Sequence, residues 1–180
     1  GFAQIMNESH KDPLSDSHKS RVGQILKAGN HLLELINEVL DLARVEAGKI
    51  TVSMEPINIA ELTADVLNVV HPMAEKFSIR LIDEVTAQNN VYIFADRTRL
   101  KQVLLNLLSN GIKYNRKEGS VTLSLNKQED GTVNILVTDT GMGIPPKKLK
   151  KIFVPFDRLG ADSSEVEGTG IGMTISKKLI

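Results

Sequence analysis

The 180-residue chain has no cysteine, and only 4% of its residues are aromatic. The lack of cysteine leaves no disulfide framework and is compatible with a reducing compartment. Its 22 basic and 22 acidic side chains cancel, so no overall charge attracts nucleic acid or a membrane. No apolar run approaches the about 18 residues of a membrane span, and the first residues are not a signal peptide. We therefore expect a globular cytoplasmic protein, with any membrane anchor of a longer parent outside this chain.

The first quarter of the chain has the pattern of a long helix in a helical bundle. Between Ser15 and about Glu46 there is no proline, and apolar residues recur in heptads over three repeats. The stripe consists of Val22, Gly29, Ile36 and Ala43, with Ile25, Leu26, Leu32, Leu33, Val39 and Leu40 between them. A helix stub at 2–6 and a turn at 11–13 precede it. Because one such hairpin leaves its stripe uncovered, we expect it to form a homodimer.

The chain changes character near residue 48, which predicts two domains, residues 1–48 and residues 49–180. Strands are predicted at 49–54, 79–84, 91–95, 120–126 and 133–138. Helices are predicted from Asn58 to about Lys76 and from Asp96 onward, and Asp130-Gly131 predicts a hairpin turn. The basic run at 147–151 follows two prolines and is typical of the solvated face of a short helix, not of a nucleic-acid site. Three helices on one mostly antiparallel sheet would form an α+β fold, a two-layer α/β sandwich.

Two glycine-rich turns lie near the end of the chain. Asp139-Thr140-Gly141-Met142-Gly143-Ile144 directly follows a predicted strand, and Gly168-Thr169-Gly170-Ile171-Gly172 opens a predicted helix. A carboxylate at a strand end can accept a hydrogen bond from the amine of a base. Glycine amides can approach phosphates because no Cβ lies in the way. Together these turns favour a nucleotide site.

A helix upstream carries three polar residues on one face. Asn106 and Asn110 are four residues apart, and Lys113 follows one turn later, on a helix whose other face is apolar. An amide oxygen is a suitable ligand for Mg²⁺, and an ammonium group suits phosphate oxygens. The alternative is that these residues are solvated polar side chains on a helix surface.

The combination of motifs resembles the catalytic and ATP-binding domain of bacterial two-component sensor histidine kinases. That domain belongs to a superfamily with the gyrase, heat-shock chaperone and mismatch-repair ATPases. Residues 106–115 resemble its N box, residues 139–143 its first glycine box, Phe153-Val154-Pro155-Phe156 its F box, and residues 168–172 its second glycine box. The resemblance implies a Bergerat-type ATP-binding fold, preceded by a long helix of a dimerisation hairpin, with ATP and Mg²⁺ as cofactors.

The resemblance also implies a role for each matching residue. Asn110 would be the Mg²⁺ ligand, Lys113 would contact phosphate, and Asn106 would take the place of the glutamate that activates water in the superfamily's ATPases. Because an amide cannot accept that proton, the site favours a kinase over a hydrolase. The nucleotide would be bound by Asp139, Tyr114, Gly141, Gly143, Gly168, Gly170 and Gly172. Phe153 and Phe156 would anchor a lid at 154–167, and Arg158 would reach the γ-phosphate.

The sequence departs from the family pattern at two places. The stretch Ser9-His10-Lys11-Asp12-Pro13-Leu14 falls where the hairpin turn belongs, so His10 is interpreted as a turn residue and the phosphoacceptor histidine as missing. Ile180 falls inside the helix that opens at the second glycine box, so we interpret the domain as truncated at its C-terminus. The intact parent would phosphorylate a histidine and then the receiver domain of a response regulator. The alternatives are a superfamily ATPase and an inert nucleotide-binding or dimerisation module.

Overall fold

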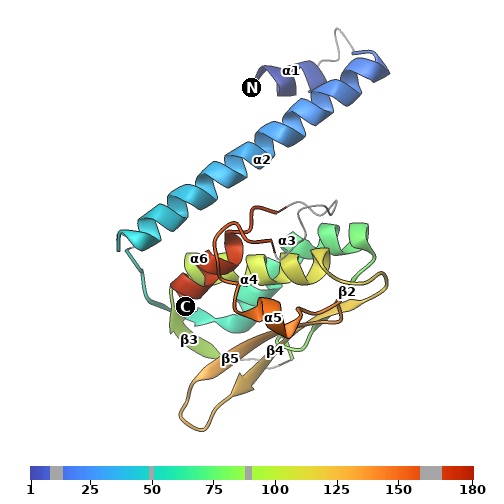
Figure 1. Ribbon diagram of the computed structural model, residues 1–180. Helices are drawn as coiled ribbons and strands as arrows, with labels where there is room; N and C mark the ends of the chain where they lie inside the picture. Colours follow the sequence, from blue (N-terminus) through green and yellow to red (C-terminus); the bar gives the residue numbers. More distant parts are fainter. Residues whose placement is uncertain (9–13, 49–50, 88–90, 159–167) are drawn as a thin grey trace. The chain divides into compact units, whose positions relative to one another are not determined.

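The computed structural model describes residues 1–8, 14–48, 51–87, 91–158 and 168–180. The chain forms two compact units, residues 1–47 and residues 48–180, and each is described by itself. The first unit consists of α1 (Phe2–Glu8) and α2 (Asp16–Glu46), which contact each other, and α2 is one long, unbroken helix (Figure 1). Within the described ranges, no helix is both long and apolar enough to cross a membrane.

Helix α2 confirms the long helix predicted from Ser15 to Glu46. It begins where the Ser15 hydroxyl accepts a hydrogen bond from the backbone N–H of His18 at 3.4 Å, which satisfies one free donor of the first turn. Much of its predicted apolar stripe is exposed, including Ile25, Leu32, Leu33, Ile36, Val39 and Leu40. The turn predicted at 11–13 and His10 lie outside the described residues.

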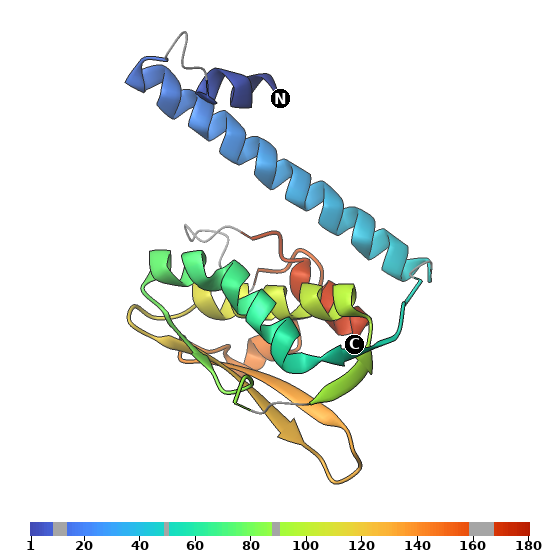
Figure 2. The same ribbon diagram turned by 180° about the vertical axis from the view of Figure 1, so that it is seen from behind.

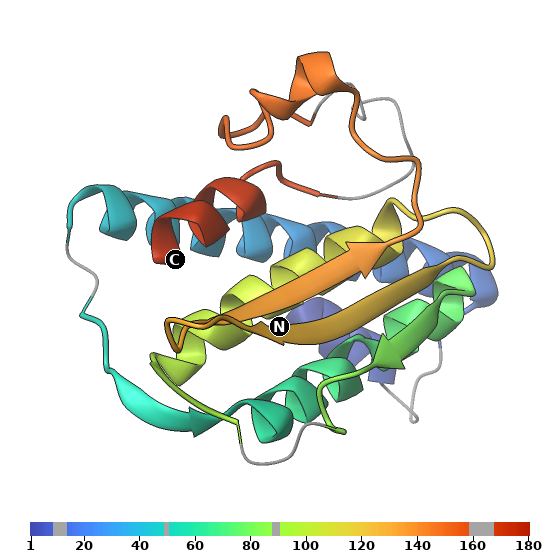
Figure 3. The ribbon, with the colours of Figure 1, turned by 90° about the horizontal axis from the view of Figure 1, so that it is seen from below.

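The described residues of the second unit form five strands in two sheets. Strand β1 (Glu55–Asn58) pairs antiparallel with β3 (Tyr92–Ala95). Strands β2 (Arg80–Asp83), β4 (Ser120–Lys127) and β5 (Val133–Asp139) form the other sheet in the order β2-β4-β5, visible face-on in Figure 3. The β4–β5 pair is antiparallel, and the predicted turn between these strands is confirmed, with Gly131 at φ 85°.

The longer helices of this unit lie on one face of the three-stranded sheet. Helices α3 (Ile59–Phe77) and α4 (Arg97–Lys113) contact each other and the sheet, and α6 (Gly172–Leu179) packs on α4 (Figures 1 and 2). A short helix, α5 (Pro146–Leu149), begins at the second of the two prolines and confirms the short helix predicted there. Asp96 caps α4 by accepting from the backbone N–H of Arg99 at 2.9 Å. The pKa of the Asp96 carboxyl lies below its ordinary value. The hydrogen bond from Arg99 is the largest cause, and a hydrogen bond from the Ser53 N–H is the second.

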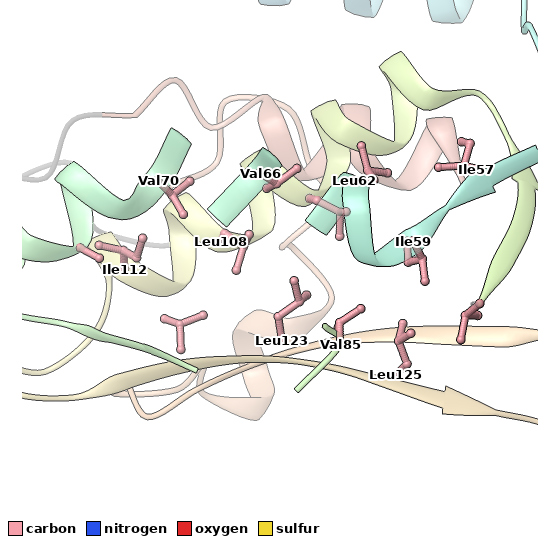
Figure 4. Close-up of a cluster of buried hydrophobic side chains, with 14 of the residues drawn as sticks. Ile57, Ile59, Leu62, Val66, Val70, Val85, Leu108, Ile112, Leu123 and Leu125 are labelled. Carbon is pink, nitrogen blue, oxygen red and sulfur yellow. The ribbon is translucent and has the colours of Figure 1, made fainter. Parts of the chain in front are cut away.

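The hydrophobic core fills the space between the helices and the sheet. Figure 4 shows side chains of α3 and α4 facing those of β4. The α3 residues Leu62, Val66 and Val70 and the α4 residues Leu108 and Ile112 are buried against Val121, Leu123 and Leu125 of β4. Alternate β4 residues are buried because successive strand side chains point to opposite faces of the sheet. This layering confirms the two-layer α/β fold and places the C-terminal end of α4 near the end of β5.

Two details of the sequence-based fold prediction are wrong. Residues 51–54 of the strand predicted at 49–54 have no regular structure, and β1 begins at Glu55 and includes Pro56. Among the described residues β1 pairs only with β3, so its other edge needs no N–H donors and proline fits there. The expected single sheet is instead two sheets, and β2 runs parallel to β4. The β2-to-β4 connection includes α4, and a crossover of that length permits parallel pairing.

Candidate nucleotide-binding site

Asp139 is the last residue of β5 and begins a tight turn. One carboxylate oxygen, Oδ1, accepts a hydrogen bond from the backbone N–H of Gly141 at 2.8 Å, while the side chain remains exposed. A Cβ at Gly141 would lie 2.6 Å from the Tyr114 carbonyl oxygen and 2.8 Å from Asp139 Oδ1. Only glycine therefore fits at 141 without displacing a neighbour. The turn holds the carboxylate in one direction and leaves its second oxygen available to a ligand.

Helix α4 packs against this strand end through Gly111. A Cβ at Gly111 would lie 3.5 Å from the Asp139 Cβ and 3.3 Å from a methyl group of Val121. The absence of a side chain at 111 thus lets the helix pack closely against β4 and β5. Asn110 precedes Gly111, so the two residues on which the nucleotide prediction depends lie on adjacent elements. The packing role of Gly111 was not predicted from the sequence, although a glycine inside a helix is a recognisable signal of close packing.

A second overlooked feature is a polar clamp behind Asp139. The Asn115 amide donates to the carbonyl oxygens of Gly111 and Ser120, each at 2.9 Å. The Thr140 hydroxyl donates to Asn115 Oδ1 at 3.1 Å and accepts from the Ser120 N–H at 2.9 Å. These bonds join the end of α4, the start of β4 and the residue after Asp139. The clamp therefore keeps Asp139 at a constant position relative to α4.

Asn106 and Asn110 are hydrogen-bonded to each other and connect α4 to α6. Asn110 Nδ2 donates to Asn106 Oδ1 at 3.2 Å, and Asn106 Nδ2 donates to Ser176 Oγ at 2.7 Å. A Cβ at Gly172 would overlap the Asn106 amide, so glycine at the start of α6 makes room for that side chain. The structure thus brings Asn106, Asn110 and Gly172 together. Neither side chain is a freely solvated helix polar group, because both are half-buried.

The predicted F box packs on the second glycine box. The backbone N–H of Phe156 donates to the Gly170 carbonyl oxygen at 3.0 Å, and the Thr174 hydroxyl of α6 donates to the Phe153 carbonyl oxygen at 3.0 Å. Lys177 Nζ lies 4.5 Å from the centroid of the Phe153 ring. Both phenylalanine rings are largely exposed. The two motifs therefore meet through their backbones, leaving the rings at the surface.

The remaining predicted site residues differ in how closely they contact their neighbours. A Cβ at Gly170, where φ is 74°, would lie 3.3 Å from Arg158 Cγ, and one at Gly168 would lie 3.7 Å from the Tyr114 hydroxyl. Lys113 is on the last turn of α4 and is half-buried. Gly143 stands apart, since a Cβ there would meet nothing within 4 Å, and its φ of 68° favours glycine. Of the predicted lid at 154–167, residues 159–167 lie outside the described residues.

The side chain of Asn110 fits a magnesium ion whose other ligands are mainly phosphate oxygens. Among the described residues, no group of three or more His, Cys, Asp or Glu side chains is arranged to hold a metal by itself. The Asn110 amide donates its N–H toward Asn106, which directs its carbonyl oxygen away from that contact. A single amide oxygen is a hard, neutral ligand of the kind that Mg²⁺ accepts beside phosphate oxygens.

Comparison with known proteins gives the same assignment. Residues 95–180 match the family described as histidine kinase-, DNA gyrase B-, and HSP90-like ATPase. The circadian input-output histidine kinase CikA of Synechococcus elongatus is 35% identical over 170 residues, covering 93% of this chain and 22% of that protein. The chain spans about a fifth of the length of the curated relatives that it matches.

Solved structures of histidine kinases share the fold. Full-length ShkA in complex with AMPPNP is 30% identical with a TM-score of 0.78, covering 99% of this chain and 36% of that one. ThkA in complex with the response regulator protein TrrA is 27% identical with a TM-score of 0.65, covering 100% of this chain and 48% of that one. The chain therefore carries the ATP-binding domain of the sensor histidine kinases and belongs to that family.

Proposed function

We propose that this chain is the ATP-binding kinase portion of a sensor histidine kinase. It would bind ATP and direct the γ-phosphoryl group to a histidine, from which a response-regulator aspartate would receive it. The observation that carries the proposal is the close packing of α4 on β5, with Gly111 against Asp139, which places the Asn110 turn beside the Asp139 turn. Base recognition and phosphate binding would then occur at two ends of one site.

Each end of the site has groups suited to its part of the nucleotide. Asp139 would accept a hydrogen bond from the adenine amine, because Gly141 occupies only one of its two carboxylate oxygens. Asn110 would hold Mg²⁺, and Lys113, Arg158 and the amides around Gly168, Gly170 and Gly172 would meet the phosphates. Tyr114 would pack against the nucleotide, and Gly143 would complete the Asp139 turn. A magnesium ion held by Asn110 would supply positive charge that partly neutralises the phosphate oxygens. Catalysis would rest on positioning and charge, with no covalent step on this domain.

The contacts of Asn106 support transfer over hydrolysis. The side-chain N–H group of Asn106 donates a hydrogen bond to Ser176, and the side-chain carbonyl oxygen accepts one from Asn110. The side chain is therefore held at both ends. A neutral amide cannot remove a proton from water at the pH of the cell. ATP would therefore persist in the site until a stronger nucleophile, the imidazole of a histidine, reaches its γ-phosphorus. In such a transfer the bond to the imidazole nitrogen forms, the bond to the bridging oxygen breaks, and ADP leaves.

The partners follow from the surface of the first unit and from the relatives. The exposed apolar residues of α2 suit a homodimer through the helical hairpin, which would bury them in a helical bundle. A response-regulator receiver domain is the second partner, by similarity to the ThkA–TrrA complex. Because ATP is the phosphoryl donor, the proposal places this domain in the cytoplasm.

Calorimetry with AMPPNP and Mg²⁺ tests the binding half of the proposal. Asp139→Asn should weaken binding roughly tenfold to a hundredfold, since hydrogen bonds to charged groups contribute about 1.5–3 kcal/mol. The control is Asp65→Asn, which alters a carboxylate in an exposed ion pair with Arg97, away from the site, and should bind normally. Negligible binding by the unsubstituted chain would instead identify an inert module.

Phosphoryl transfer needs a separate acceptor in the assay. The chain is mixed with Mg·ATP and a polypeptide that carries a histidine-kinase dimerisation helix with its histidine, and acid-labile phosphate on the acceptor is measured. Asn110→Ala should abolish the signal, whereas Asn126→Ala, at an exposed β4 position, should retain it. Release of inorganic phosphate at the same rate without any acceptor would identify an ATPase and refute the kinase assignment.

A further inference from the structure

Two residues of α6, Ser176 and Met173, contact Asn106. Asn106 Nδ2 donates to Ser176 Oγ at 2.7 Å and lies 3.8 Å from Met173 Sδ. Ser176 is only 5% exposed, so water does not compete for its hydroxyl. Gly172, one turn before Ser176, leaves the room in which the Asn106 amide lies. Asn106 is thus the point at which α6 contacts the asparagine face of α4.

The chemistry of these neighbours determines which end of the Asn106 amide faces α6. A serine hydroxyl both donates and accepts, so Ser176 alone would tolerate either end. A thioether sulfur has lone pairs but no proton, so a hydrogen bond to Met173 Sδ has to come from a donor. Only Nδ2 meets that requirement. Asn106 Oδ1 therefore faces in the other direction, toward Asn110.

The orientation of Asn110 follows from that of Asn106. The side-chain oxygen of Asn106, Oδ1, needs a hydrogen-bond donor, and Asn110 Nδ2 supplies one at 3.2 Å. The carbonyl oxygen of Asn110 is then the end that remains for a ligand. In the reverse orientation, the amide N–H group of Asn106 would face Asn110. The side-chain oxygen of Asn110 would then have to accept that hydrogen bond. An N–H group would then point at the cation and repel it.

We propose that Ser176 and Met173 are positioning residues, which fix the amide of Asn106 and through it present the Asn110 oxygen to the nucleotide-bound Mg²⁺. This inference rests on the proposed function, because it concerns the same metal–nucleotide site. It also links metal binding to the docking of α6, which directly follows the second glycine box. By thermodynamic reciprocity, Mg·ATP stabilises α6 on α4 to the same extent that docked α6 favours the binding of Mg·ATP.

The test compares nucleotide affinity with and without metal in the whole 180-residue chain. Calorimetry with AMPPNP is carried out once with Mg²⁺ and once with EDTA, and the ratio of the two affinities gives the magnesium gain. Ser176→Ala should lower this gain by about threefold to tenfold, the effect of losing one hydrogen bond, and leave the affinity in EDTA unchanged. Met173→Leu preserves volume and removes the sulfur, so it should lower the gain as well.

Ser109→Ala is the matched control. Ser109 is half-buried, and its hydroxyl donates to the backbone carbonyl oxygen of Asn106 at 3.0 Å, so its loss leaves the orientation of the Asn106 side chain unaffected. The magnesium gain should stay at the value of the unsubstituted chain. An undiminished gain in Ser176→Ala, or an equal loss of affinity with Mg²⁺ and with EDTA, would overturn the inference. Failure of the unsubstituted chain to bind AMPPNP would refute the proposed function instead, so the two failures are distinguishable.

Discussion

Replacing Gly141 by alanine tests whether the Asp139 turn is built for a ligand. The added Cβ would lie 2.6 Å from the Tyr114 carbonyl oxygen and 2.8 Å from Asp139 Oδ1. The first neighbour is backbone at the end of α4, where Tyr114 N–H donates to the Asn110 carbonyl oxygen at 3.0 Å. That backbone cannot move without disturbing the helix end. The turn itself has to shift, and the Asp139 carboxylate has to rotate away from Gly141.

The size of the effect follows from the bond that is lost. Rotation of the carboxylate breaks its 2.8 Å hydrogen bond with the Gly141 N–H, which holds Asp139 in the orientation suited to a base amine. Hydrogen bonds to charged groups contribute about 1.5–3 kcal/mol, and each 1.4 kcal/mol is a factor of ten. We therefore expect Gly141→Ala to weaken AMPPNP binding roughly tenfold to a hundredfold. The chain should stay folded, because Gly141 lies outside the hydrophobic core.

Calorimetry with AMPPNP measures the nucleotide affinity of each variant, and thermal unfolding measures its stability. The control is Gly131→Ala in the β4–β5 turn, where φ is 85° and a Cβ would meet nothing within 4 Å. It should cost about 1 kcal/mol of stability through backbone strain and leave nucleotide affinity unchanged. If Gly141→Ala binds as tightly as the unsubstituted chain, the turn does not orient Asp139 and the base-recognition argument is wrong.

Three further predictions concern the clamp, the core and the cap of α4. Thr140→Val removes the hydroxyl that bonds to Asn115 and Ser120, so it should lower the unfolding free energy by about 1–3 kcal/mol and weaken AMPPNP binding, and Thr140→Ser should restore both. Leu108→Ala, at a fully buried α4 position, should cost about 2–5 kcal/mol in urea unfolding, and a loss well below that range would show that the α3–α4–β4 core is loosely packed. The pKa of Asp96 is lowered in the folded state, so its stabilising contribution is complete above the ordinary carboxyl pKa of about 3.9 and is lost as the pH falls through the folded value. Melting temperatures measured from neutral to acidic pH should therefore fall less for Asp96→Asn than for the unsubstituted chain, and parallel curves would contradict this.

Local sequence signals predicted most of the elements. Ser15 and Asp96 mark the starts of α2 and α4 because their side chains satisfy N–H groups that the first helical turn leaves free. Asp130-Gly131 marks the β4–β5 turn, because glycine readily adopts the positive φ found there. Capping and turn chemistry depend on neighbours within about four residues, so the order of residues along the chain is enough to predict them.

Strand pairing was harder to predict, because it joins distant segments. The apolar run before Pro56 indicated a strand at 49–54, yet the residues that pair with β3 are Glu55–Asn58. Nothing near Pro56 in the sequence reveals that β3 provides its only partner strand. The parallel pairing of β2 with β4 likewise depends on where α4 crosses the sheet. The hydrogen bond between Asn115 and Thr140 in the polar clamp was not predicted for the same reason, since the two residues are 25 residues apart.

The sequence by itself determined the motifs of the nucleotide site, the heptad helix and the family, because these depend on residue types at short, regular spacings. Only the tertiary structure decided which atoms face one another. Asn106, read along the chain, is an amide one turn before Asn110; in the fold it is held by Ser176, 70 residues away, and so orients Asn110. Hydrogen bonds are short and directional, so the end of an amide that faces a ligand is known only once α6 has packed on α4.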